Sequence, residues 1–318
     1  MVVAVVTGCA GFIGSSLTRA LIASGWEVRG IDIVRPYYDP AIKRANLSSL
    51  APLRSFRFFE RELADLEDPT FAKELLDGAS VVYHQAAQPG VRASWSDFKG
   101  YVRDNIIATY ALLEATVRSG IPRLVYASSS SVYGNAKSYP VVENSTLAPV
   151  SPYGVTKASA EQLTHAYSSN HPLSVVALRY FTVYGPGQRP DMATHRLIQA
   201  ALTGDPFPLY GDGSQIRDFT FIADAVRANM LAGASDTPGF SAVNVSGGSE
   251  IFLGDLISLV ERTSGRSIAL DRRGTQAGDV RRTGGDNSLA RELFGWDPRV
   301  PIEEGVAAQV EWERGLYG

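Results

Sequence analysis

The chain has 318 residues, 45% of them hydrophobic, and a formal net charge of −3. This size predicts a globular protein with a large core, in one large domain or two unequal ones. The small net charge gives no signal for nucleic acid or an anionic membrane surface, and no apolar run reaches the roughly 20 residues of a spanning helix. The single cysteine, Cys9, excludes an internal disulfide framework and favours a cytoplasmic location.

The first predicted unit is a strand, a glycine-rich turn and a helix. Residues 2–6 are all apolar, as in a strand of a parallel sheet that is buried on both faces. Three glycines follow at G-x-x-G-x-x-G spacing, which lets the backbone approach a pyrophosphate at the start of the next helix. The residues predicted to hold this part of a dinucleotide are Gly8, Gly11, Phe12, Ile13 and Gly14.

An acidic residue lies at the end of the second predicted strand, residues 28–33. A carboxylate at this place, Asp32, can accept hydrogen bonds from a ribose diol and repels a 2′-phosphate, so NAD is favoured over NADP. Arg35 is close by and weakens that preference slightly. The alternative is that Asp32 is an ordinary turn residue.

Two further strand ends carry residues suited to ligand contact. The apolar residues 81–83 precede Gln85, Ala86 and Ala87, and small residues there let a cofactor lie against the backbone. Tight packing of a strand on a helix would also explain them. Residues 124–127 lead into four serines, 128–131, at an edge where ligands bind in open α/β sheets, although serine runs are usually plain loop.

Tyr153 and Lys157 form the candidate for catalysis. Residues four apart lie on the same face of a helix, and a nearby positive charge favours a phenolate. Tyr153 could therefore act as a base at a pH where a free phenol would not. This spacing also occurs by chance, so the surrounding motifs are what supports a catalytic role.

Together these motifs resemble the extended short-chain dehydrogenase/reductase family, in the branch that acts on nucleotide sugars. They follow the family's order over almost the whole chain, through the serine run, Val132-Tyr133-Gly134 and the segment 151–157. The resemblance implies an α/β fold, a doubly wound parallel sheet of the Rossmann type with a smaller C-terminal α/β substrate domain. It implies that Ser129 joins Tyr153 and Lys157 in catalysis. The further NAD contacts that it implies are Asp65, Leu66, Asn105, Tyr153, Lys157 and Tyr180.

Positions in the second half resemble UDP-glucuronate 4-epimerases. Thr182 stands where UDP-galactose 4-epimerases usually carry Asn, and Arg189 follows seven residues later. The resemblance implies that both hold a sugar carboxylate, with help from Ser130 and Ser131, because a guanidinium matches a carboxylate bidentately. A surface ion pair is the alternative role of Arg189.

Two segments resemble the family's contacts to the rest of the substrate. The segment 210–218 is similar to the uridine and pyrophosphate segment, with Arg217 as the diphosphate candidate or, alternatively, a surface ion pair. The segment 276–280 is similar to the glucuronate branch, where Asp279 would bind the ribose, and Thr283 falls at the residue that bounds the sugar pocket. The remaining predicted substrate contacts are Arg92, Tyr210, Arg217, Gln276 and Asp279, in addition to Ser129.

The resemblance implies an NAD-dependent isomerase that interconverts UDP-glucuronate and UDP-galacturonate through a transient 4-keto intermediate. The alternatives are a UDP-glucose/UDP-galactose 4-epimerase, a UDP-glucuronate decarboxylase and a non-catalytic NAD-binding module. Related 4,6-dehydratases carry Asp-Glu, and related decarboxylases usually Glu, where this chain has Ser130 and Ser131, which argues against both reactions. The four histidines are scattered, so no metal site is expected.

We expect the NAD-binding domain to span residues 1–179, with later segments near 218–262 returning to it. The substrate domain is expected to span residues 180–318. The resemblance also implies a homodimer, formed through the helices near Tyr101 and Tyr153.

Overall fold

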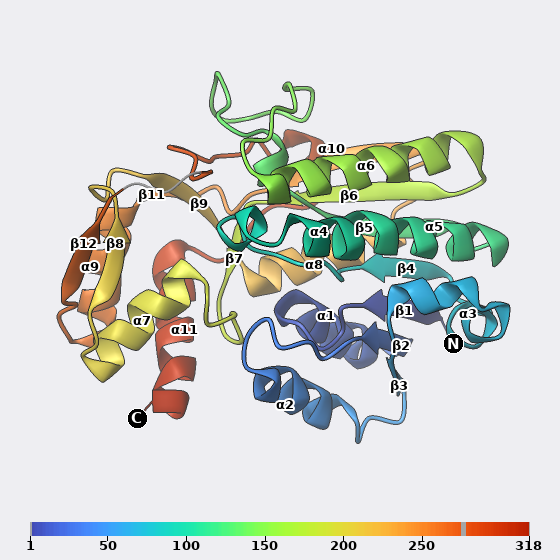
Figure 1. The fold of residues 1–318 in the computed structure, drawn as a ribbon, viewed down its shortest axis with the longest axis horizontal. Helices are drawn as coiled ribbons and strands as arrows, with labels where there is room; N and C mark the ends of the chain where they lie inside the picture. The colour runs from blue at the N-terminus through green and yellow to red at the C-terminus, as the bar shows by residue number, and fades with distance from the viewer. Residues whose placement is uncertain (1, 275–277, 318) are drawn as a thin grey trace.

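The computed structural model describes residues 2–274 and 278–317. Its larger part is a seven-stranded sheet in which neighbouring strands are parallel (Figure 1). The chain winds outward from β1 through β2 and β3, then returns to the other side of β1 and winds outward through β4, β5 and β6. This order confirms the predicted doubly wound α/β fold. Across the sheet the strands are β10 (Phe240–Val245), β6 (Ser174–Tyr180), β5 (Arg123–Ser129), β4 (Val81–His84), β1 (Val3–Thr7), β2 (Glu27–Asp32) and β3 (Phe56–Glu60).

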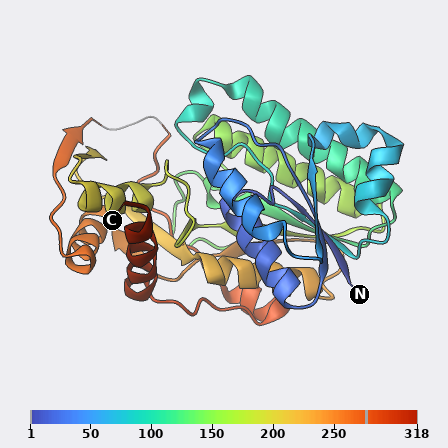
Figure 2. The ribbon, with the colours of Figure 1, turned by 90° about the horizontal axis from the view of Figure 1, so that it is seen from below.

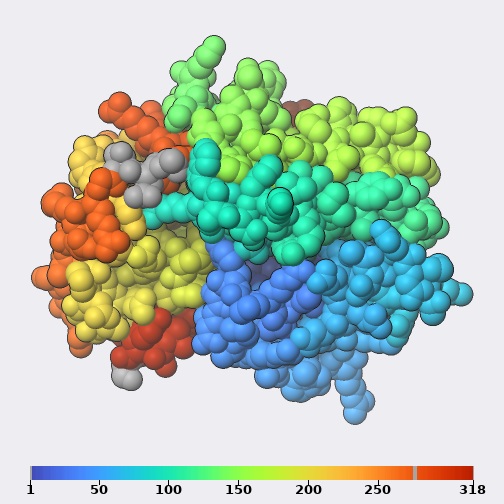
Figure 3. All heavy atoms as spheres, viewed as in Figure 1, coloured from blue at the N-terminus to red at the C-terminus, as the bar shows by residue number. Residues whose placement is uncertain are grey.

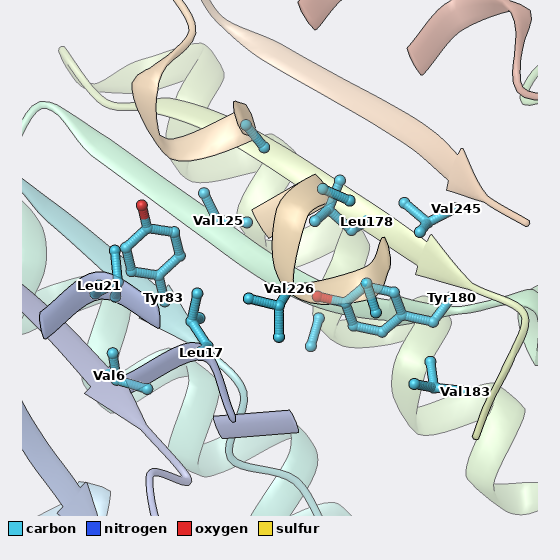
Figure 4. Close-up of a cluster of buried hydrophobic side chains, with 14 of the residues drawn as sticks. Val6, Leu17, Leu21, Tyr83, Val125, Leu178, Tyr180, Val183, Val226 and Val245 are labelled. Atoms are coloured by element: carbon cyan, nitrogen blue, oxygen red, sulfur yellow. The ribbon is translucent and has the colours of Figure 1, made fainter. Parts of the chain in front are cut away.

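Helices cover both faces of this sheet (Figure 2). Because side chains alternate along a strand, a strand covered on both faces is apolar throughout, as Ala4, Val5 and Val6 are in β1. Figure 4 shows one of the two cores, where Leu17 and Tyr83 lie together. One face is covered by α1 (Phe12–Ala23), α2 (Pro40–Leu50), α8 (Ile222–Ala234) and α10 (Ser288–Phe294), and the other by α3 (Pro69–Leu76), α5 (Ala108–Arg118) and α6 (Pro152–Asn170).

The strand register brings chemically useful residues to one edge of the sheet. Thr7 of β1 pairs with His84 of β4, and Ser129 of β5 pairs with Tyr180 of β6. The carboxyl ends of the parallel strands therefore meet at this edge, with the switch point between β1 and β4. Shorter elements connect the strands and helices: η1 (Leu63–Glu67), η2 (Ala93–Trp95), α4 (Phe98–Val102), the π-helical turn η3 (Arg103–Ile107) and η4 (Ser130–Val132).

The smaller part of the molecule is built from short strands and three helices around a core of its own. One small sheet has the order β11 (Glu250–Phe252), β9 (Ile216–Phe221), β7 (Thr182–Tyr184), and the other pairs β12 (Leu270–Arg273) with β8 (Phe207–Tyr210). Leu197, Leu256 and Val306 are buried where the helices pack together. These helices are α7 (Ala193–Thr203), α9 (Leu253–Ser264) and α11 (Ile302–Tyr317).

The chain crosses between the two parts more than once. From the segment 218–262, β10 belongs to the large sheet and α8 packs against it. So does α10, at residues 288–294, whereas α9 packs with α7 and α11 in the smaller part. Within residues 2–274 and 278–317, no helix is long and apolar enough to cross a bilayer.

Candidate active site

A cavity of about 270 Å³ lies at the carboxyl ends of the central strands. Figure 3 shows a hollow on this side of the molecule, between the blue N-terminal segments and the teal segments near residue 100. The wall includes the first turn of α1, the end of β2, and the segment after β4. Tyr153, Lys157, Tyr180 and Arg189 also line it. Residues far apart in the chain thus share one wall at the switch point of the sheet, where ligands bind in such folds.

The glycine turn is shaped for close contact with a ligand. Gly8 has φ +69°, and a Cβ on it would lie 2.7 Å from the backbone nitrogen of Ala86. A Cβ on Gly14 would lie 2.1 Å from the Gly8 carbonyl oxygen. Helix α1 begins after Gly11 without a side-chain cap, so the N–H groups of its first turn, which lack intrahelical partners, lie at the cavity wall. This arrangement fits a pyrophosphate.

Asp32 lies at the next strand end and is held from two sides. Its Oδ2 accepts the Ala10 N–H at 3.0 Å, and its Oδ1 accepts from Lys43 Nζ at 2.8 Å. Burial raises the pKa of the Asp32 carboxyl, and Lys43 opposes this. Sequence reasoning missed Lys43, which only the fold of α2 brings beside the carboxylate. Both side chains line the cavity, where a ribose diol would fit.

Arg35 is already paired with two carboxylates. Its Nη2 lies 2.5 Å from Glu62 Oε1, and its Nη1 lies 2.6 Å from Asp104 Oδ1. Its position in the sequence predicts that Arg35 weakens the preference for NAD slightly. Because Glu62 and Asp104 neutralise its charge, Arg35 is less available to bind a 2′-phosphate than its position in the sequence suggests.

Three predicted cofactor residues lie behind the cavity wall. The carboxylate of Asp65 accepts the Glu62 N–H at 3.3 Å, and Leu66 is fully buried in the core. Asn105 fixes the segment after β4, since its Oδ1 accepts the Gln88 N–H at 2.7 Å and its Nδ2 donates to Thr156 Oγ1 at 2.9 Å. At these positions the wall itself is formed by Glu62, Leu63, Ala64 and Gln88.

The segment after β4 is fixed by side chains from three other elements. Gln85 Nε2 donates to Asn229 Oδ1 at 2.8 Å, and the Tyr180 hydroxyl donates to the same oxygen at 2.9 Å. The Ala86 N–H donates to Thr7 Oγ1 at 3.0 Å. Gln85, Ala86 and Ala87 all line the cavity. Hydrogen bonds from β1, β6 and α8 therefore hold this part of the cavity wall in place.

Tyr153 and Lys157 of α6 reach the cavity from one face of the helix. Burial raises the pKa of the Tyr153 phenol, while a hydrogen bond from Ser129 and the charge of Arg189 lower it. Burial lowers the pKa of the Lys157 ammonium to about 7, and Glu161 opposes that shift. The spacing in the sequence predicts that Lys157 lowers the pKa of Tyr153. Among the groups of the protein, burial has a larger effect on the pKa of Tyr153 than the opposing hydrogen bond and charge. The pKa of the phenol is therefore raised above its ordinary value.

A buried ion pair holds α6 in place. Arg179 Nη2 lies 2.6 Å from Glu161 Oε1, and Ser128 donates to Glu161 Oε2 at 2.5 Å. Glu161 stands one turn after Lys157, so this pair ties α6 to both β5 and β6. Sequence reasoning did not identify it, although the spacing of four residues from Lys157 placed Glu161 on the same face.

Only one of the four residues predicted to bind the sugar carboxylate, Arg189, lines the cavity that contains Tyr153. Arg189 lines the wall, and its Nε and Nη2 lie 2.9 Å from Oδ1 and Oδ2 of Asp191. The half-buried residues Ser130, Ser131 and Thr182 lie at the ends of β5 and β7, next to the wall rather than in it. The Ser131 N–H donates to Ser129 Oγ at 3.2 Å.

Four predicted substrate residues from distant segments meet outside this cavity. Arg92 lies over the Tyr210 ring, 4.0 Å from its centroid, and its Nη2 lies 3.0 Å from Asp279 Oδ2. Arg217 donates to the Ile216 carbonyl at 2.9 Å, burial lowers its pKa, and Asp279 opposes that shift. An aromatic ring and two guanidinium groups suit a base and a diphosphate. The predicted residue Gln276 lies outside the described residues, and Thr283 accepts the Asp218 N–H at 3.1 Å.

Metal-binding side chains are not clustered in the part of the chain that the structure describes, where no three His, Cys, Asp or Glu residues could share an ion. The candidate site is thus a nucleotide cavity with a buried phenol, an amine and a guanidinium on its wall.

Residues 4–246 match the model of the NAD dependent epimerase/dehydratase family. A UDP-glucuronate 4-epimerase of Thermodesulfobacterium geofontis is 36% identical over 312 residues, which cover 97% of this chain and 95% of that protein. YtcB of Bacillus subtilis, described as an uncharacterized UDP-glucose epimerase, is 41% identical over 317 residues and 98% of both chains.

The solved structure of a UDP-glucuronic acid 4-epimerase from Bacillus cereus, in complex with UDP-glucuronic acid and NAD, is 40% identical. It has a TM-score of 0.93 and covers 99% of this chain and 100% of that chain. These similarities confirm the resemblance seen in the motifs. The chain belongs to the NAD dependent epimerase/dehydratase family, of the extended short-chain dehydrogenase/reductase type.

Proposed function

We propose that this protein is an NAD-dependent 4-epimerase that interconverts UDP-glucuronate and UDP-galacturonate through a transient 4-keto sugar. One observation carries the proposal: the Arg189 guanidinium lines the same cavity as Tyr153 and is close enough to lower the pKa of its phenol. A base for the C4 hydroxyl and a cation for the neighbouring carboxylate therefore lie together. The likeness to the Bacillus cereus enzyme, solved with UDP-glucuronic acid and NAD, supports the same reaction.

The residues that would hold NAD fit it well. The turn from Gly8 to Gly14 would hold the pyrophosphate, and Asp32 with Lys43 would hold the adenosine ribose. Bound NAD supplies reversible acceptance of a hydride from the sugar C4. Because the hydride returns to the sugar, the reaction has no net redox change and needs no second substrate.

Tyr153 is the base for the sugar C4 hydroxyl, and it returns the proton after the ketone has turned over. Ser129 donates a hydrogen bond to the phenol oxygen, which stabilises the phenolate. Lys157 brings an ionisable amine with a pKa of about 7 to the same wall. The cationic nicotinamide ring would add a positive charge that opposes the upward shift from burial.

A uronic acid introduces a side reaction that the site must suppress. The 4-keto intermediate is a β-keto acid, which loses CO₂ when the bond to the carboxylate aligns with the carbonyl π system. Holding the carboxylate near the ring plane keeps this alignment poor. Arg189 is the cation for this task, with the hydroxyls of Thr182, Ser130 and Ser131 as its neighbours.

UDP-glucose/UDP-galactose epimerisation is the second candidate. It is favoured by the pairing of Arg189 with Asp191, because a neutral C6 group can bind beside a guanidinium whose charge is already balanced. The likeness to YtcB, described as a UDP-glucose epimerase, points the same way. Both reactions use the same phenol and the same cofactor, so only the C6 contacts separate them.

The test is to incubate the holoenzyme separately with UDP-glucuronate and UDP-glucose and to resolve the products by chromatography. We expect UDP-galacturonate from the first sugar at the higher kcat/KM. Tyr153→Phe should lower kcat by roughly 10²- to 10⁴-fold, the usual contribution of a general base. Tyr110→Phe makes the same change at an exposed position and should keep full activity. Full activity in the Tyr153→Phe variant would refute the assignment of the base.

A homodimer in the cytoplasm is part of the proposal. Phe98, Tyr110 and Val155 are 41–45% exposed and come from α4, α5 and α6, where α4 and α5 both pack against α6. Large apolar side chains gathered on neighbouring helices often mark a protein interface. The buried and unpaired Cys9 is compatible with a reducing compartment.

A further inference from the structure

The guanidinium proposed to bind the substrate's acid group already holds a carboxylate of the protein. Arg189 Nε and Nη2 each lie 2.9 Å from an oxygen of Asp191, which is a bidentate pair. The Arg189 side chain is 17% exposed and that of Asp191 is 36% exposed, so the pair lies at the edge of the cavity. Asp191 is accessible enough to be displaced, whereas Arg189 is mostly shielded from water.

The side chains of Tyr37 and Tyr38 beside the pair do not neutralise the charge of Arg189. Arg189 and Asp191 both act on the phenols of Tyr37 and Tyr38, which follow β2 and line the cavity. Burial raises the pKa of the Tyr38 phenol to about 12, so both neighbours are neutral at physiological pH and supply no compensating charge. Within residues 2–274 and 278–317, Asp191 is the carboxylate that lies within ion-pair distance of Arg189.

We propose that Asp191 is an internal competitor for Arg189, and that it sets how strongly the site discriminates a uronate from a sugar with a neutral C6 group. This inference rests on the proposed function. The C6 carboxylate of a uronate is the same chemical group as the Asp191 side chain. The substrate carboxylate must either displace Asp191 from the Arg189 guanidinium or share the guanidinium with it.

The competition affects the two kinds of substrate in opposite ways. When a neutral C6 group binds, the ion pair stays intact and no shielded charge loses its partner. When a uronate binds, part of its attraction to Arg189 is offset by the loss of the Asp191 contact or by repulsion between two carboxylates. Discrimination is a difference of two affinities, so Asp191 lowers it without touching the reacting carbon.

Replacing Asp191 with asparagine removes the competing charge and keeps the side chain's size. In Asp191→Asn we expect KM for UDP-glucuronate to fall by up to about fivefold, the value of one partly exposed ion pair. We expect KM for UDP-glucose to stay the same or rise, because a neutral C6 group now leaves Arg189 unpaired. The ratio of kcat/KM for UDP-glucuronate to that for UDP-glucose should therefore increase. Asp205→Asn, at an exposed position after α7, is the matched control and should leave the ratio unchanged.

A purely structural role for Asp191, in which it only orients Arg189, gives the opposite result. In that case Asp191→Asn would raise KM for UDP-glucuronate and lower the ratio, which would overturn the proposal, as would an unchanged ratio. Combining Asp191→Asn with Arg189→Ala provides a second readout. If Asp191 acts through the guanidinium, adding Asp191→Asn to Arg189→Ala should change neither KM.

Titration calorimetry of the NAD-loaded protein with UDP-glucuronate separates this inference from the proposed function. If the parent protein epimerises neither sugar, the proposed function fails, and the calorimetric affinities still test the competition. A tighter affinity in Asp191→Asn supports it, and an equal or weaker affinity overturns it. If the parent epimerises UDP-glucuronate but the variant shows no gain in discrimination, only the competition is wrong.

Discussion

At the scale of single residues, Arg189 has two tasks that the structure brings together. It lines the cavity next to the phenol of Tyr153, and its charge lowers the pKa of that phenol. It is also the cation that would hold the acid group of a uronate beside the carbon that becomes a ketone. Affinity and product identity should therefore depend on the same side chain.

Arg189→Ala should raise the share of UDP-pentose among the products. Without the guanidinium, the carboxylate of the 4-keto intermediate rotates more freely, so its bond to the ring reaches the alignment in which CO₂ leaves. Chromatography of a timed reaction on UDP-glucuronate measures the ratio of UDP-pentose to UDP-galacturonate. Arg262→Ala removes an exposed arginine from α9 and should leave this ratio at the parental value. An equal ratio in Arg189→Ala and the parent would show that Arg189 does not restrain the carboxylate.

At the scale of elements, α11 supports the segment that carries Arg189 and Asp191 from behind. Gln309 accepts the Gly185 N–H at 2.9 Å and donates to Gln188 Oε1 at the same distance. One turn later, Glu313 Oε1 lies 3.3 Å from His195 Nδ1 at the start of α7. Burial raises the pKa of Glu313 to about 8 and lowers the pKa of His195. Both side chains are therefore mainly neutral at neutral pH, and their contact is not an ion pair.

Glu313→Gln should remove a loss of stability that the parent protein suffers at high pH. In the unfolded chain Glu313 loses its proton near pH 4.5, whereas in the folded protein it keeps the proton up to about pH 8. Its contribution to stability is complete below pH 4.5 and is lost as the pH rises to about 8. Glutamine matches the neutral acid in shape and does not ionise. The variant should match the parent at pH 4.5 and exceed it by on the order of 2–4 kcal/mol at pH 9.

Urea unfolding at pH 4.5 and pH 9 measures this difference. Glu311→Gln, whose side chain is 78% exposed on the same helix, is the control and should follow the parent at both pH values. A Glu313→Gln variant that gains nothing at pH 9 would mean that Glu313 ionises in the fold at its ordinary pKa.

At the scale of the whole molecule, α6, which carries Tyr153 and Lys157, is also part of the proposed dimer surface. Val155 is 41% exposed and stands between Tyr153 and Lys157, which face the cavity. One side of α6 thus lines the cavity while another meets solvent. A partner subunit on that side would fix the position of the base.

Tyr110→Asp should convert a dimer to a monomer, because it places a charge among the exposed apolar side chains of α4, α5 and α6. Sedimentation velocity of the parent and the variant at micromolar concentration measures the change. Leu316→Asp introduces the same charge at a 54% exposed position on α11 and should leave the dimer intact. A monomeric parent, or a variant that remains dimeric, would exclude this surface as the interface.

The sequence predicted the fold well because its signals were local and repeated. Uninterrupted apolar strands such as residues 2–6, each followed by a helical pattern, are typical of a parallel sheet covered on both faces. The glycine turn and the Tyr153–Lys157 spacing also located the candidate site, since short motifs carry their own geometry. Contacts such as Lys43 with Asp32, or Gln309 with Gln188, could not be predicted, because they join segments that meet only after folding. The upward pKa shift of Tyr153 was missed for the same reason, as burial is a property of the folded chain.

The support of the sugar-side loop by α11 has a consequence for how the protein matures during synthesis. Strands β1 to β6 leave the ribosome well before residues 302–317, so the nucleotide half can form while translation continues. The hydrogen bonds that join Gln309 to Gly185 and Gln188, in the loop that carries Arg189, form only after Gln309 has emerged. A nascent or prematurely terminated polypeptide would therefore form its dinucleotide-binding site before its sugar-binding site is complete.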